Sequence, residues 1–93
     1  MKCNQIIYSL HALKRMLDRD ISIESIKHVI EHGIEIRQYV DDKPYPSILF
    51  LSFVNNKPVH VLVALNYLGN ICIIVTVYYP DEDMWNDDFT KKI

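Results

Sequence analysis

The spacing of the hydrophobic residues changes at Gly33, and this change constrains the fold more than any other feature of the sequence. Before Gly33 the apolar residues recur with the period of an amphipathic helix. After Gly33 they alternate with polar residues or form short apolar runs, which is typical of strands. A chain with helices first and neighbouring strands afterwards is predicted to adopt an α+β fold.

Two short helices are predicted before Gly33. Ser9 is a suitable N-cap for the first helix, and Ser22 is a suitable N-cap for the second. The apolar stripe of the first helix comprises Leu10, Leu13 and Leu17. The stripe of the second comprises Ile23, Ile26, Val29 and Ile30. Gly33 follows at a position where helices commonly end in a left-handed residue. Both helices are expected to pack on the sheet.

A twisted antiparallel sheet of about four strands is predicted after Gly33, over residues 34–40, 48–54, 59–65 and 71–79. Pro44 and Pro46 indicate that residues 41–46 form a loop, because proline cannot donate a hydrogen bond to a strand partner. Trp85 and Phe89 in the acidic tail are expected to anchor that tail. The expected core comprises Leu10, Leu13, Leu17, Ile26, Val29, Ile30, Ile48, Phe50, Val61, Val63, Ile73 and Val75.

Size, charge and cysteine content restrict the class of protein. A chain of 93 residues is expected to form one domain, residues 1–93. The net charge of −2 argues against a protein that coats nucleic acid through bulk electrostatics. Cys3 and Cys72, without a secretory signal before them, are predicted to be free thiols in a reducing cytosol. No apolar run is long enough to span a bilayer, so a cytoplasmic protein is expected.

One face of the first helix is the best candidate for chemistry. His11, Arg15 and Arg19 follow one another at a spacing of four residues, with Asp18 beside them. A histidine can transfer a proton, and two fixed guanidinium groups can stabilise charge on a phosphate. This combination suits cleavage of RNA by its own 2′-hydroxyl. The alternative is a solvated helix face, on which Asp18 pairs with a neighbouring cation.

Other candidate residues lie on the strands and loops. His60 is on a central strand and is a further candidate for proton transfer, although a lone histidine there is more often structural. Thr76 and Tyr78 share one face of the last strand and are candidates for contacts with RNA, but tyrosines also cover sheet edges. Lys43, Lys91 and Lys92 are candidate phosphate contacts.

No metal and no cofactor are expected. His28 and His32 match the H-x-x-E-H pattern of inverted zinc peptidases, with two imidazoles on one helix face. However, the helix ends at Gly33, and the last-turn position of His32 is explained by the helix dipole. A peptidase cleft also does not fit a chain of this length, so the sequence predicts a metal-independent protein.

The stretch from Ser9 to Ser22, SLHALKRMLDRDIS, resembles the opening signature of a family of small bacterial domains of unknown function, S-x-H-A-x-x-R-M-x-x-R-x-I-S. Further similarity extends through residues 39–46, 58–61 and 74–85. Such proteins are similar to RelE-like and MqsR-like toxins, and many are encoded beside a small zinc-finger antitoxin. The resemblance implies a compact RelE- or barnase-like ribonuclease fold, with His11, Arg15 and Arg19 facing His60 and the strand that carries Thr76 and Tyr78. The family usually has glycine at Asp20, so a strained turn is expected there.

These observations lead to two alternative functions. The first is a toxin-type, metal-independent endoribonuclease that acts on free RNA or on ribosome-bound mRNA and is inhibited by a cognate antitoxin. The second is a non-enzymatic protein-binding module that uses the sheet edge or the tail around Trp85 as its interface. Convergence of the candidate residues on one concave surface would favour the enzyme, because function depends on the site and not on the fold.

Overall fold

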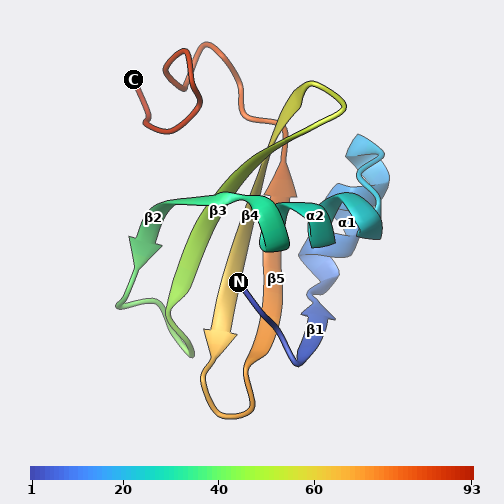
Figure 1. The fold of residues 1–93 in the computed structure, drawn as a ribbon, viewed down its shortest axis with the longest axis vertical. Coiled ribbons are helices and arrows are strands. Elements are labelled where there is room, and N and C mark those ends of the chain that lie inside the picture. Colours follow the sequence, from blue (N-terminus) through green and yellow to red (C-terminus); the bar gives the residue numbers. More distant parts are fainter.

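The computed structural model describes residues 1–93 and contains two helices and one five-stranded sheet. The elements are β1 (Gln5–Tyr8), α1 (Leu10–Arg19), α2 (Ile23–His32), β2 (Ile34–Tyr39), β3 (Ser47–Val54), β4 (Lys57–Asn66) and β5 (Ile71–Tyr78). The strand order is β1-β5-β4-β3-β2, and both helices pack on the sheet (Figure 1). Strands β2 to β5 form the predicted antiparallel meander, and the α+β class is confirmed.

The prediction of about four strands missed β1, which pairs in parallel with β5 and makes the sheet mixed. Strand β1 has only four residues, and it follows no turn that would mark a strand in the sequence. Its partner is at the other end of the chain, with Gln5 opposite Ile71. A strand this short is stabilised by long-range pairing, so periodicity alone could not identify it.

The helix starts are as predicted, and the end of α1 shows the strained turn expected at Asp20, but the end of α2 differs from expectation. The hydroxyls of Ser9 and Ser22 accept hydrogen bonds from the third residue after each of them. Asp20 ends α1 in the left-handed conformation with φ 55°, where glycine is usually favoured. Gly33 was predicted to be left-handed and is instead extended, with φ −74° and ψ 164°. It must be glycine for another reason, since a Cβ there would collide with the backbone oxygens of Val29 and Leu51.

The core lies between the helices and one face of the sheet. Six of the expected core residues are buried: Ile26, Val29, Ile30, Phe50, Val61 and Val63. Ile48, Ile73 and Val75 are only half-buried.

The leucine stripe of α1 is a wrong prediction. Leu10, Leu13 and Leu17 are 76%, 41% and 83% exposed, and α1 contacts β5 through Ala12 and Met16. The small Ala12 side chain lets the helix backbone approach the strand. Periodicity shows that a helix has an apolar stripe, but α1 has two neighbouring stripes and only packing decides which one is buried.

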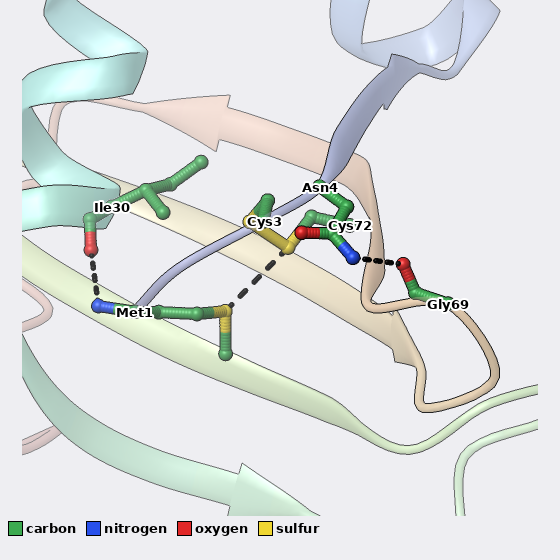
Figure 2. Close-up of a disulfide and its surroundings, with 6 residues drawn as sticks. All are labelled: Met1, Cys3, Asn4, Ile30, Gly69 and Cys72. Atoms are coloured by element: carbon green, nitrogen blue, oxygen red, sulfur yellow. Dashed lines mark hydrogen bonds between the residues drawn. A yellow bond between two sulfur atoms is a disulfide. The ribbon is translucent and has the colours of Figure 1, made fainter.

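A disulfide joins Cys3 to Cys72, so the prediction of two free thiols is wrong (Figure 2). The disulfide connects the segment before β1 to the start of β5. These two strands are also hydrogen-bonded to each other, so the disulfide lies next to a parallel strand pair. Asn4 adds a hydrogen bond of 3.0 Å from Nδ2 to the Gly69 carbonyl, and the Met1 amino group donates to the Ile30 carbonyl at 2.9 Å. The cysteines are adjacent only because β1 and β5 are neighbours, which the sequence did not reveal.

The C-terminal tail covers part of the sheet face opposite the helices. Trp85 is 4% exposed, and its ring packs against the ring of His60 with centroids 4.4 Å apart. Phe89 packs edge-on against Phe53 with centroids 6.4 Å apart. Both predicted anchors are therefore confirmed. Neither helix has the length and apolar content needed to cross a membrane.

Candidate functional site

A hollow of about 300 Å³ lies between α1 and β5 and is lined by five residues. All five were identified from the sequence as candidate site residues. They are His11, Arg15, Arg19, Thr76 and Tyr78. His11 Nε2 is 3.0 Å from the Thr76 hydroxyl, and this bond joins the helix to the strand across the hollow. The structure thus brings together three of the four basic side chains of α1 with the polar face of β5.

Ser9 sets the position of α1 relative to β5. Its hydroxyl accepts a hydrogen bond from the Ala12 amide at 3.0 Å and donates one to the Val75 carbonyl at 3.1 Å. The register of β4 and β5 shifts between Leu62 and Val63, which makes Val75 the extra residue of a bulge. Bulges redirect neighbouring side chains. Ser9 therefore joins the first turn of α1 to the bulge immediately before Thr76, which places His11 over Thr76.

No carboxylate neutralises the cations of the hollow. The single ion pair of the structure joins Glu31 to His32 on α2, so Asp18 does not pair with a cation of α1. The face itself is solvent-exposed at His11 and Arg19, as the solvated-face alternative expects. Arg15 and Arg19 lie one helical turn apart, and like charges at this spacing repel each other mildly. An anion between them would relieve this repulsion, so the hollow is suited to bind an anionic group.

His60 lies behind the hollow and not in it. The side chain is fully buried, with Nε2 2.8 Å from the Phe89 carbonyl and Nδ1 3.1 Å from the Tyr78 hydroxyl. A carbonyl can only accept, so Nε2 carries the proton of the neutral ring and Nδ1 accepts from Tyr78. The Tyr78 proton therefore points inward, and its oxygen lone pairs remain available to accept a hydrogen bond from a ligand. His60 can act on a ligand only through Tyr78.

Burial shifts the pKa values of this pair in opposite directions. Desolvation lowers the pKa of His60, and the hydrogen bond to the Phe89 carbonyl partly offsets this effect. Desolvation raises the pKa of Tyr78, with a further increase from Tyr39 and a decrease from the Arg37 guanidinium. Both groups are thus neutral near pH 7, and Arg37 is close enough to Tyr78 to act on it electrostatically.

Acid should destabilise the protein through His60. Because the folded state lowers the pKa of His60, the unfolded chain binds the additional proton below about pH 6.5, the ordinary histidine value. The contribution of His60 to the free energy of unfolding is fully present above that pH. It falls as the pH decreases, by at most about 1.4 kcal/mol per pH unit for one group. Urea unfolding of wild type and His60→Gln between pH 5 and 8 tests this. A pH dependence that is equally steep in the variant would assign the effect to other groups.

The remaining predicted contacts lie outside this hollow. Lys43 is exposed in the loop between β2 and β3. Lys91 and Lys92 line a second hollow of about 290 Å³, together with Ile36, Arg37 and Thr90. Arg37 was not among the candidate residues predicted from the sequence, because a single arginine on a half-exposed strand does not by itself indicate a binding site. Ser9 was identified only as a helix cap.

The largest hollow, of about 660 Å³, lies elsewhere, between the N-terminal segment and α2. It contains Lys2, Lys27 and Glu31 but no histidine or arginine, so it lacks the proton-transfer and guanidinium groups of the smaller hollow. On α2, the rings of His28 and His32 are 4.9 Å apart. No cluster of three or more histidine, cysteine or acidic side chains is arranged to hold a metal ion.

Comparison with known proteins identifies a family but no characterised relative. The model of DUF4258, a domain of unknown function, matches residues 8–79, which include α1, all of β2 to β5 and every residue that lines the hollow. No curated protein and no solved structure matches the chain. Because the match covers well over half of its length, the chain belongs to the DUF4258 family.

Proposed function

We propose that this protein is a toxin-type endoribonuclease that cleaves RNA without a metal ion, in the cytoplasm. The observation that carries the proposal is the convergence of His11, Arg15 and Arg19 with Thr76 and Tyr78 around one hollow. These side chains come from opposite ends of the chain, and nothing in the packing of the core requires them to be polar. The resemblance to RelE-like and MqsR-like toxins points to the same activity.

The proposed reaction is an attack of the RNA 2′-hydroxyl on the adjacent phosphorus. His11 removes the 2′-hydroxyl proton, and the new bond between O2′ and phosphorus forms as the bond to the 5′-oxygen breaks. The leaving 5′-oxygen takes a proton from water, since the hollow is open to solvent. The products are a 2′,3′-cyclic phosphate and a 5′-hydroxyl, and His11 returns its proton to solvent.

The other side chains of the hollow stabilise and orient the substrate. Arg15 and Arg19 carry permanent positive charges and stabilise the negative charge that grows on the phosphate oxygens. Thr76 bonds to His11 and holds the imidazole in place. Tyr78, whose proton is directed to His60, accepts a hydrogen bond from the ribose or supplies its ring for a base to stack on.

Replacement of Arg15 tests the proposal. Wild-type protein should cleave RNA in the presence of a chelator and leave a 2′,3′-cyclic phosphate. Arg15→Ala removes one stabilising cation and should lower the rate by about 10²–10³, as the loss of an electrostatic stabiliser does. Lys14→Ala is the matched control, because it removes the same charge from the same helix outside the hollow. Circular dichroism should show that both variants are folded.

The same variants can be compared for toxicity in cells. Induced expression of wild type and Lys14→Ala should arrest growth, whereas Arg15→Ala at an equal soluble level should not. If the two variants have equal effects, the hollow is not the site. If wild-type protein, free of any partner, cuts no RNA on or off ribosomes, the protein is not a ribonuclease.

A protein-binding function is the second candidate, and the exposed leucines of α1 favour it. Leu10 and Leu17 lie on the same ten-residue helix as His11, Arg15 and Arg19, so a protein bound to them would reach the mouth of the hollow. Burial of Trp85 makes the tail around it unsuitable as an interface. As a non-enzymatic module, the protein would bind its partner through these leucines and would not cut RNA. In the ribonuclease proposal the same surface binds the cognate antitoxin, of the zinc-finger type, and Leu17→Asp should abolish its inhibition while RNA cleavage continues.

A further inference from the structure

The second hollow is built by β2 and the C-terminal tail. Arg37 contributes a guanidinium group that lies 5.6 Å from the centre of the Tyr39 ring. Lys91 and Lys92 are on the returning segment of the tail, which is fixed by a hydrogen bond from the Asn86 amide to the Lys91 carbonyl and by pairing of Trp85 with Lys92. The cations are thus held on ordered backbone.

A continuous series of contacts connects this hollow to the first one. Tyr78 lines the first hollow, and its hydroxyl bonds to His60 at 3.1 Å. The His60 ring packs on Trp85 at 4.4 Å, and Lys92 Nζ lies 5.9 Å from the centre of the Trp85 ring. Arg37 also influences the pKa of Tyr78 electrostatically. Tyr78 lines the first hollow and is linked through His60 and Trp85 to Lys92 of the second.

We propose that Arg37, Lys91 and Lys92 form a second phosphate subsite, which holds a neighbouring phosphate of the RNA strand whose scissile phosphate lies between Arg15 and Arg19. This inference rests on the proposed function and extends it to the substrate, which is single-stranded RNA longer than a dinucleotide. Tyr78 lines the first hollow and Tyr39 contacts Arg37 of the second, so both rings can stack unpaired bases, which a duplex would not present.

One acidic group opposes the subsite. Thr90 lines the second hollow, and its hydroxyl donates to the Asp88 carboxylate at 2.6 Å, so a negative charge lies close to this hollow. Three positive charges outweigh this single carboxylate, but Asp88 should weaken the binding of a phosphate. Replacing Asp88 should therefore strengthen phosphate binding, whereas replacing Arg37 should weaken it.

Binding of a single-stranded RNA decamer with 2′-O-methyl groups tests the subsite without cleavage. The binding constant K, measured by fluorescence anisotropy at several salt concentrations, falls as the salt concentration rises. In Arg37→Ala the steepness of log K against log[salt] should be smaller by about 0.7, the value for one phosphate contact on a single strand. The triple replacement of Arg37, Lys91 and Lys92 by alanine should lower it by about 2. Asp88→Asn should tighten binding at low salt, and Lys27→Ala, which removes a distant charge, should change nothing.

Cleavage measurements separate this inference from the proposed function. Arg37→Ala should lower kcat/KM for an RNA decamer about tenfold, since the loss of one hydrogen bond to a charged group has that order of effect. It should leave kcat/KM for a dinucleotide unchanged. Equal loss of decamer binding in Arg37→Ala and Lys27→Ala, or no binding by wild type, would overturn the subsite. Decamer binding that depends on Arg37 without any cleavage would support the subsite and overturn the ribonuclease.

Discussion

Replacing Cys3 with alanine is expected to lower the free energy of unfolding by about 4 kcal/mol. The disulfide joins residues separated by 69 positions. In the chain-entropy model, a crosslink that closes a loop of this length destabilises the unfolded state by about 4–5 kcal/mol at 25 °C. Cys3 is half-buried and Cys72 fully buried, so alanine at Cys3 creates the smaller cavity and reports the crosslink more directly.

Urea unfolding of the oxidised wild type, the reduced wild type and Cys3→Ala measures this effect. Reduction and replacement should destabilise the protein to the same extent, and a reducing agent should have no effect on the variant. Equal stability of oxidised and reduced wild type would show that the crosslink does not contribute. The result also bears on the proposed location, because in a reducing cytoplasm both thiols would be free and the fold would have to persist without the crosslink.

Replacing His11 with alanine is expected to lower the rate of RNA cleavage by about 10²–10⁴, the usual contribution of a proton-transfer group. His11 is exposed on α1 and its Nε2 bonds to Thr76, so its loss removes one surface hydrogen bond and little packing. The variant should remain folded.

A matched variant controls for the loss of a histidine. His28→Ala, which removes an exposed histidine from α2, should retain the full rate of RNA cleavage. A full rate in His11→Ala would remove His11 from the mechanism and leave the arginines as the only assigned groups of the hollow.

The candidate site was predicted from the sequence to a large extent, because helical spacing alone determines which side chains share a helix face. His11, Arg15 and Arg19 lie at intervals of four residues and line one hollow, as do Thr76 and Tyr78, which are two residues apart on a strand. The location of His60 could not be predicted in the same way. It lies behind Tyr78 because the tail returns over β4 and supplies both Trp85 and the Phe89 carbonyl.

Local signals in the sequence determined the helix starts, the loop at residues 41–46 and the order of the four antiparallel strands, since capping, proline and alternation act over a few residues. Only the tertiary structure decided that β1 pairs with β5, that Cys3 meets Cys72, and that α1 buries Ala12 and Met16 while its leucines face solvent. Each of these depends on contacts between distant segments. Such contacts are selected by the packing of the whole chain, and no short window of sequence contains them.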